Sequence, residues 1–316
     1  MSKLNLSIVI PIYYSEKTLY SLGSILIKEL GTRYDLQIVM VNDGSTDQSH
    51  SEGIRFANDY PTQVQFITLS KNVGQDGATM AGLNYATGDY VVVMDDDFQH
   101  HISEIHSLVN KIQTDKNDVV FVKFKNNSHA FHRRLGSKFN DIIATILLKK
   151  PRDLYLSTFK IMKRRLVKEL CKNKSPYVYV DGLVCRLTSN TGVIDIPHGE
   201  RKEGQSGYTL IKLIGVWLNM STGFSILPLR IATVSGVFVS SFSLLYGIYT
   251  VISKFLDPDY PEGWATLIVL ITLFSGVQLL FLGIVGEYIG RLFMFQNGKP
   301  QYTVSYDSCE LHHGDY

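Results

Sequence analysis

Three acidic residues, Asp95, Asp96 and Asp97, stand directly after an apolar run of three valines and a methionine. Adjacent carboxylates repel one another, so they are costly at the end of a half-buried strand unless a cation neutralises them. Alternate residues of an extended chain project to the same side, so Asp95 and Asp97 can share one hard divalent ion, with Gln99 as a neutral oxygen ligand. Such an ion would stabilise a diphosphate leaving group. An acidic turn is the alternative.

A second polar cluster, residues 42–47, also follows an apolar run. Asp43 at the end of a strand could accept hydrogen bonds from a nucleotide base, and Gly44 permits a sharp turn. An Asp-Gly turn with capping residues for the next helix would explain the same sequence without a ligand.

A third cluster contains Lys71, Asn72 and Gly74 and precedes a helix-length segment. Backbone amides at a helix N-terminus, together with the ammonium of Lys71, are suited to phosphate groups. An ordinary helix start is again the alternative.

These clusters follow β-branched runs that alternate with polar, helix-length segments. Residues 6–10, 37–41, 64–69, 90–94 and 119–124 are predicted to be strands. This alternation predicts an α/β domain with a mostly parallel sheet and helices on both faces. Ligands of such sheets bind at the carboxyl ends of the strands, so we expect the three clusters and residues 11–16 to meet on one rim.

The charge of the chain is nearly balanced overall and uneven locally. Its 316 residues include 31 basic and 29 acidic ones, which argues against a general nucleic-acid binder. Residues 123–174 carry fifteen Lys or Arg against three acids. Such a basic stretch suits an anionic membrane or a phosphate-bearing substrate, and a solvated surface is the alternative. The three cysteines share no CxxC spacing, which indicates a reducing compartment.

Two uncharged segments, residues 231–253 and 265–286, are each long enough to cross a hydrocarbon core of roughly 30 Å. Arg230 precedes the first and Arg291 follows the second, whereas the connection between them is acidic. The positive-inside rule therefore places both chain ends in the cytoplasm. The alternative is a buried helical hairpin of a soluble protein. The N-terminus lacks a signal-peptide pattern, so the first domain is expected to stay in the cytosol.

The order and spacing of the clusters resemble glycosyltransferase family 2. The matching positions are Pro11-x-Tyr13, Asn42-Asp43-Gly44-Ser45, Asn72-x-Gly74, Asp95-x-Asp97-x-Gln99 and Arg201-x-x-Gly204-Gln205-Ser206. With two apolar segments at the C-terminal end, the whole pattern is similar to the bacterial polyprenyl-phosphate glycosyltransferases and, more distantly, to dolichyl-phosphate mannose synthase.

The resemblance implies a GT-A nucleotide-diphospho-sugar transferase fold, Mg²⁺ or Mn²⁺ as cofactor, and inversion at the anomeric carbon. The implied reaction moves one sugar from a nucleotide-sugar donor, by default a uridine diphosphate sugar, to undecaprenyl or another polyprenyl phosphate, for surface glycan assembly. Expected partners are the donor, the lipid acceptor, the bilayer, further copies in a homotetramer and a downstream flippase, with no nucleic acid.

The expected site has three groups of residues. Nucleotide or substrate binding is assigned to Pro11, Tyr13, Ser15, Asp43, Lys71, Asn72, Gly74, Asp96 and Ser206; metal binding to Asp95, Asp97 and Gln99; and catalysis to Asp97, Lys160 and Arg201.

The chain departs from the family pattern at two places. Residues 13–15 read Tyr-Tyr-Ser where Tyr-Asn-Glu is common, so base contacts there stay open. Residues 157–160 read Ser-Thr-Phe-Lys in place of Gly-Asp-Phe-Arg, so Thr158 stands where a carboxylate would act as base. The oxygen of a polyprenyl phosphate is already anionic and needs positioning more than deprotonation, which Lys160 and Arg201 would supply.

The expected organisation is a cytoplasmic GT-A catalytic domain (1–207), an interfacial amphipathic helix (208–228), a two-helix transmembrane hairpin (229–294) and a cytoplasmic tail (295–316) in the inner or cytoplasmic membrane. Ordinary core packing is the alternative for the amphipathic helix.

A catalytically degenerate membrane scaffold or flippase accessory that binds nucleotide sugar is the functional alternative. The altered residues at 13–15 and 158 favour it, and the complete Asp-x-Asp-x-Gln set counts against it.

Overall fold

The computed structural model describes residues 3–97, 102–125, 145, 154–197, 227–256 and 263–309. They belong to two compact units, Met1–Gly207 with Lys299–Tyr316, and Tyr208–Gly298. Gln99, Arg201 and Ser206 lie outside the described residues, as does nearly all of the expected amphipathic helix at 208–228.

The first unit is built on an eight-stranded sheet with the order β7-β5-β6-β4-β1-β2-β3-β8. The strands are β1 Leu4–Ile12, β2 Tyr34–Asn42, β3 Val64–Leu69, β4 Tyr90–Val93, β5 Val119–Lys125, β6 Lys160–Lys163, β7 Thr191–Pro197 and β8 Val304–Asp307. The central strands β4, β1, β2 and β3 are parallel to their neighbours within this group, as the sequence predicts. β6 runs antiparallel to β4 and β5, and β8 runs antiparallel to β3.

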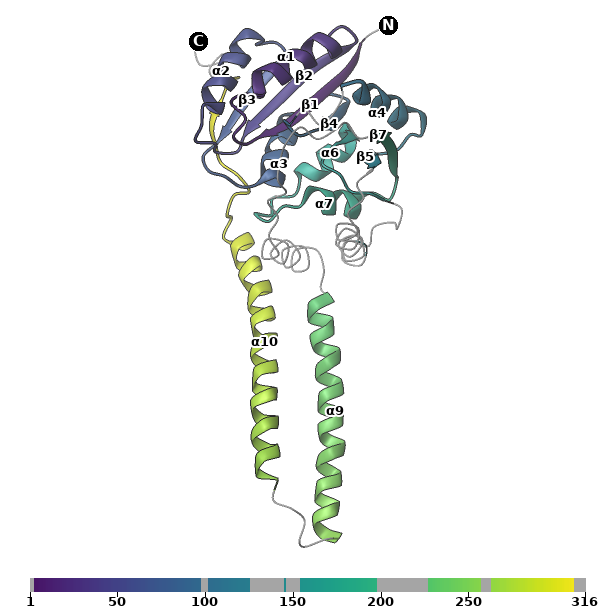
Figure 1. The fold of residues 1–316 in the computed structure, drawn as a ribbon, viewed down its shortest axis with the longest axis vertical. Coiled ribbons are helices and arrows are strands. Elements are labelled where there is room, and N and C mark those ends of the chain that lie inside the picture. Colours follow the sequence, from purple (N-terminus) through teal and green to yellow (C-terminus); the bar gives the residue numbers. More distant parts are fainter. Residues whose placement is uncertain are drawn as a thin grey trace. The chain divides into compact units, whose positions relative to one another are not determined.

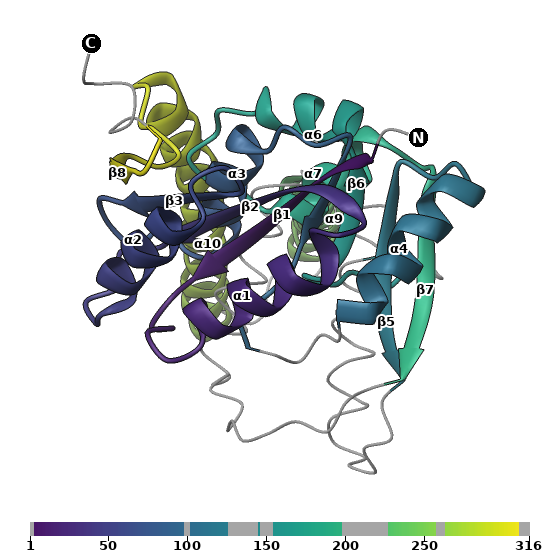
Figure 2. The same ribbon diagram turned by 90° about the horizontal axis from the view of Figure 1, so that it is seen from above.

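Helices cover both faces of this sheet (Figures 1 and 2). They are α1 Leu19–Leu30, α2 Ser49–Asp59, α3 Gln75–Tyr85, α4 Ile102–Thr114, α6 Arg164–Cys171 and α7 Val180–Leu187. On one face, Ile8 and Ile10 of β1 join the apolar core with Leu22 and Leu26 of α1, and with side chains of α2 and α4. On the other face α3 lies against β1 and β2.

The close approach of α3 to the sheet depends on Gly82. A β-carbon at this position would come within 2.4 Å of Val9 and 3.2 Å of Val41. Without a side chain there, the helix backbone can pack directly on the alternate residues of β1 and β2. This contact positions the first turn of α3 beside the ends of those strands.

The last strand, β8, belongs to residues 295–316, which the sequence predicts to be a tail, and it lies beside β3 at the edge of the sheet (Figure 2). The Gln65 side chain donates to the Asp307 carboxylate at 3.0 Å, and the backbone N–H of Phe66 donates to Ser308 Oγ at 3.0 Å. Residues from Lys299 onward therefore belong to the first unit. The chain returns to the sheet after its second long apolar helix.

The second unit contains two long helices, α9 Leu227–Leu256 and α10 Trp264–Gln296, which contact each other. Within them Pro228–Tyr249 and Leu273–Gln296 are apolar and long enough to cross a membrane, and no part of either window is buried. Apolar side chains such as Leu245 and Leu282 are about two-thirds exposed, at 67% and 66%. Helices with this much exposed apolar surface suit a lipid environment.

Candidate active site

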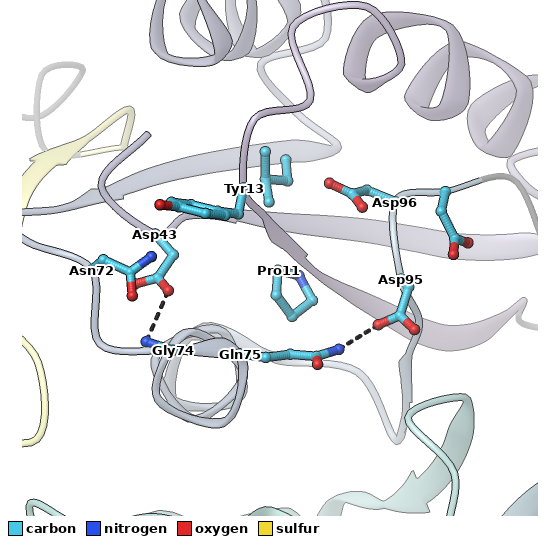
Figure 3. A pocket seen from close by; sticks show the side chains of 10 residues that line it. Pro11, Tyr13, Asp43, Asn72, Gly74, Gln75, Asp95 and Asp96 are labelled. Atoms are coloured by element: carbon cyan, nitrogen blue, oxygen red, sulfur yellow. Dashed lines mark hydrogen bonds between the residues drawn. The ribbon is translucent and has the colours of Figure 1, made fainter. Parts of the chain in front are cut away.

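The ends of the parallel strands meet at one rim of the sheet. Ile12 at the end of β1 lies beside Asn42 at the end of β2, and Val9 lies beside Val93 at the end of β4. A cavity of about 390 Å³ opens at this rim (Figure 3). Its lining comprises Pro11, Ile12, Tyr13, Asp43, Asn72, Gly74, Gln75, Asp95, Asp96 and Asp97. Eight residues expected from the sequence thus line one pocket, and Ile12 and Gln75 are additions.

Asp43 holds the loop that leads into α3. Its carboxylate accepts the backbone N–H groups of Val73 at 2.7 Å and Gly74 at 2.9 Å. Burial raises the pKa of Asp43, although these two hydrogen bonds favour the charged form. Both carboxylate oxygens are engaged with the loop, so the carboxylate shapes the pocket wall and would have to share any contact with a nucleotide base.

Gly44 allows this loop to lie close to the end of β2. Its φ of +65° is in the left-handed region, and a β-carbon there would lie 2.8 Å from the backbone N of Asn72 and 2.9 Å from the carbonyl carbon of Lys71. A side chain at position 44 would be strained and would push the loop away from the pocket.

Gly44→Ala is therefore expected to lower the free energy of unfolding by about 2 kcal/mol and to weaken nucleotide binding. Gly298→Ala is the matched control, because Gly298 has a φ of +66° with no atom near the β-carbon position. Thermal unfolding and calorimetric titration with a nucleoside diphosphate measure the two effects. Equal nucleotide affinity of the two variants would contradict the proposed role of the close contact.

Two exposed tyrosines stand at the pocket mouth. Their rings meet edge to face with centroids 4.4 Å apart, and Tyr13 lines the pocket. Tyr14 has a φ of 58°, and its backbone N–H donates to Ser45 Oγ at 3.1 Å. The hydroxyl groups of Tyr14 and Thr46 are 3.0 Å apart. The neighbouring strand end thus holds Tyr14 in an unfavourable backbone conformation, and Tyr14 in turn supports the ring of Tyr13.

The three consecutive carboxylates have different surroundings. Asp95 accepts hydrogen bonds from Gln75 Nε2 at 2.6 Å and Thr158 Oγ1 at 2.7 Å. Asp96 accepts a hydrogen bond from Ser15 Oγ. Burial raises the pKa of Asp96, and the neighbouring Asp95 and Asp97 raise it further. Asp97 is exposed at the pocket rim.

The oxygen donors of Asp95 and Asp97 fit a hard divalent ion. Among the described residues, no group of three or more His, Cys, Asp or Glu side chains converges as a set of metal ligands. Two carboxylates are nevertheless a common protein contribution for Mg²⁺, because phosphate oxygens and water complete the coordination. The donor set of the pocket therefore suits an ion that arrives together with a diphosphate.

Lys160, which the sequence predicts to contact a phosphate at the active site, lies outside the cavity. It is 3% exposed, its ammonium forms an ion pair with Asp181 of α7, and it lies 5.7 Å from the ring centre of Phe121. It is not among the residues that line the cavity. A buried ammonium that is paired in this way supports the packing of α7, and the expected contact of Lys160 with a phosphate stays a prediction. Lys71 is exposed and also does not line the cavity.

Asp76 joins α3 to the same buried charges. Its carboxylate accepts the backbone N–H of Val180 at 2.9 Å. The pKa of Asp76 is raised to about 6, chiefly by burial; Asp181 also contributes to the rise, whereas the hydrogen bond from Val180 and the ammonium of Lys160 oppose it. Two residues thus hold the N-terminal end of α7. One is Asp76, which follows Gln75, and the other is Lys160, two positions after Thr158.

The wild-type protein is expected to lose stability as the pH rises from about 4 to about 6, and Asp76→Asn is expected to reduce this loss. The unfolded chain ionises Asp76 near its usual pKa of 3.8, and the folded chain near about 6. Between these values the folded chain binds more protons, so stability falls as pH rises and the loss is complete above the folded pKa. Asparagine still offers an oxygen to Val180. Thermal unfolding midpoints across this range measure the effect, and parallel curves for variant and wild type would contradict it.

Comparisons with known proteins agree with this geometry. Residues 7–171 match the family described as glycosyl transferase family 2, and residues 227–292 match the GtrB C-terminal hairpin. The chain is 30% identical over 305 residues to a bactoprenol glucosyl transferase of Shigella phage SfV, covering 95% of this chain and 98% of the relative. It is 29% identical over 308 residues to an undecaprenyl-phosphate 4-deoxy-4-formamido-L-arabinose transferase of Shewanella sediminis, covering 94% and 91%.

The fold also resembles the crystal structure of a mycobacterial protein. The TM-score is 0.51 at 15% sequence identity, covering 69% of this chain and 73% of the other. At this identity the likeness concerns the fold alone.

Proposed function

This chain belongs to glycosyl transferase family 2, and on that basis we propose that it transfers one sugar from a nucleotide diphosphate sugar to a polyprenyl phosphate at a membrane surface. The observation that carries the proposal is a pocket of about 390 Å³ that is lined by four aspartates, Asp95 and Asp97 among them, in a chain that also has two exposed apolar helices. Two relatives that match 94% and 95% of this chain are named as an undecaprenyl-phosphate 4-deoxy-4-formamido-L-arabinose transferase and a bactoprenol glucosyl transferase.

The donor would lie along the rim of the sheet. Tyr13 and Pro11 offer an aromatic and an apolar surface for the nucleoside. The first turn of α3, which begins after Gly74, offers backbone amides and the positive end of a helix dipole to the diphosphate. Asp95 and Asp97 would hold Mg²⁺ or Mn²⁺, which supplies charge stabilisation to the departing diphosphate when bound.

The transfer would be a single displacement with inversion. The anionic oxygen of the lipid phosphate forms a bond to the anomeric carbon as the bond from that carbon to the diphosphate breaks, and the nucleoside diphosphate leaves. An already ionised oxygen needs no general base, which is consistent with a hydroxyl at Thr158. Arg201 and Ser206, outside the described residues, remain proposed contacts for the acceptor phosphate.

The two apolar helices would anchor the catalytic unit at the bilayer. The chain leaves this unit after Gly207 and re-enters it at Lys299, so both ends of the hairpin connect to the same unit. A polar unit of this kind stays on one side of a membrane, and the basic residues Arg230 and Arg291 favour the cytoplasmic side. A homotetramer and a downstream flippase are part of the proposal as partners.

Release of nucleoside diphosphate tests the proposal. The detergent-purified chain is incubated with Mn²⁺ or Mg²⁺ and a panel of sugar nucleotides, with undecaprenyl phosphate or with undecaprenol as the matched acceptor without phosphate. We expect release from one donor only when the phosphate is present. Sugar-nucleotide binding without release in the presence of the lipid phosphate would instead favour a scaffold that binds nucleotide sugars.

A further inference from the structure

The carboxylate of Asp95 is held from two sides by uncharged donors. Gln75 Nε2 donates to Oδ1 at 2.6 Å, and Thr158 Oγ1 donates to Oδ2 at 2.7 Å. Figure 3 shows Gln75 reaching from the start of α3 toward Asp95. The two donors come from segments 83 positions apart in the chain (158 minus 75) and meet at one side chain.

Both donors rest on rigid parts of the fold. Gln75 begins α3, which packs on β1 and β2 through Gly82, and the N–H of the preceding Gly74 is bound by Asp43. Thr158 precedes the fully buried Phe159, whose carbonyl accepts the N–H of Val122 at 3.0 Å. A side chain held by donors on packed elements keeps its orientation.

The contacts beneath the pocket extend this support. Asp76, the neighbour of Gln75, binds the backbone N–H of Val180, and Lys160, two positions after Thr158, is paired with Asp181. One end of α7 is therefore attached to the segment of each donor. A shift of either segment would be opposed by buried polar contacts as well as by packing.

Neutral donors suit a carboxylate that also has to bind a cation. An ionised carboxylate has about four lone-pair positions, so hydrogen bonds to its oxygens are compatible with binding a metal. An amide and a hydroxyl orient the carboxylate and leave its negative charge in place. A lysine or arginine would neutralise that charge. Removing an outer partner that orients a metal ligand typically lowers metal affinity about 10-fold to 100-fold.

We propose that Gln75 and Thr158 are positioning residues that orient Asp95 and thereby set the affinity of the pocket for the divalent ion that accompanies the donor. The inference rests on the proposed function in one respect, namely that Asp95 binds such an ion. It adds two residues that the sequence motifs do not assign, and it gives Thr158 a role of its own at the position where an acid is common.

Binding of Mn²⁺ measured by electron paramagnetic resonance, on the detergent-purified full chain with uridine diphosphate, tests this inference. Thr158→Val keeps the shape of the side chain and removes the donor, so we expect about tenfold weaker Mn²⁺ binding. Thr158→Ser restores the hydroxyl and should bind Mn²⁺ within about threefold of wild type. Gln75→Met removes the other donor and should weaken binding as Thr158→Val does.

The matched control is Thr188→Val. Thr188 Oγ1 also donates to a carboxylate, Asp118 at 2.9 Å, and neither residue lines the pocket. This variant should bind Mn²⁺ as wild type does. Thermal unfolding midpoints of all variants separate an effect on the metal from a loss of folded protein, and Gln75→Met tests the inference independently if Thr158→Val folds poorly.

Mn²⁺ affinity and sugar transfer test the positioning roles and the proposed reaction separately. Wild-type Mn²⁺ affinity in both Thr158→Val and Gln75→Met would overturn the positioning roles, even if the wild type makes lipid-linked sugar. A wild-type protein that binds no Mn²⁺ would also overturn the positioning roles. Weaker Mn²⁺ binding in both variants, in a wild type that transfers no sugar, would support the positioning roles and contradict the proposed reaction.

Discussion

Asp97→Asn is expected to lower the rate of sugar transfer by about three orders of magnitude while leaving the fold intact. Asp97 lines the pocket and is exposed, so its carboxylate contributes little to folding. Its loss removes one of two charged ligands proposed for the ion that stabilises the departing diphosphate, and single interactions of this kind account for about 10²-fold to 10³-fold in rate. Initial rates at saturating donor, with Mn²⁺ varied, measure the effect.

Asp115→Asn is the matched control for this variant. Asp115 is an exposed carboxylate outside the pocket, paired with Lys111 at 2.8 Å, and its replacement should leave transfer unchanged. If Asp97→Asn retains a tenth or more of the wild-type rate, Asp97 is not a ligand of the reacting complex. The assignment of the acidic run to the metal would then fail.

Lys160→Met is expected to lower the free energy of unfolding by about 3 to 5 kcal/mol. The methionine leaves the carboxylate of Asp181 buried without its cation, near the carboxylate of Asp76. Breaking one side of a buried ion pair is costly for this reason, whereas replacing both partners by apolar residues is often close to neutral. Lys160→Met combined with Asp181→Leu should therefore recover most of the lost stability.

Lys163→Met provides the control within the same strand. Lys163 Nζ donates to the carbonyl of Lys116 at 2.7 Å in an exposed setting, so this variant should change stability by less than about 1 kcal/mol. Denaturant or thermal unfolding of the four proteins measures the series. A fully stable Lys160→Met variant that fails only in transfer would support a phosphate-binding lysine and contradict the structural role.

The sequence could predict the pocket because its residues follow strands of strong apolar character. Pro11, Asp43, Asn72 and Asp95 each stand at or just after the end of a parallel strand, and parallel topology brings such ends together. The five predicted strands and the two long apolar helices are present in the structure. Local periodicity was sufficient for these elements.

Contacts between distant segments could not be predicted in the same way. β8 is a four-residue strand after two apolar helices, and its partners in β3, Ile67 to Leu69, lie more than 200 positions earlier. The pairing of Lys160 with Asp181 depends on how α7 packs against α3 and α6, which no spacing in the sequence encodes. Lys160 therefore looked like a phosphate ligand because of its motif, whereas its tertiary neighbours make it a buried partner of a carboxylate.

Asp96, the middle acid of the run, and the donors to Asp95 also make contacts that the sequence could not predict. Ser15 and Asp96 stand 81 positions apart and bind one another, so the departure from the common pattern at position 15 meets the middle acid in space. Gln75 could have been noticed as the first residue after a glycine at a helix start. Its contact with Asp95 depends on the crossing of α3 over the sheet and is visible only in the structure.

The mass spectrum of a lipid extract shows whether one sugar is transferred to the polyprenyl phosphate. Purified protein, Mn²⁺, undecaprenyl phosphate and the panel of sugar nucleotides are incubated together and extracted into organic solvent. We expect one new species, heavier than undecaprenyl phosphate by a single anhydrosugar unit, that requires the metal and is absent with Asp97→Asn. An extract with no such species for any donor, or with a ladder of longer glycans, would contradict transfer of one sugar to a polyprenyl phosphate.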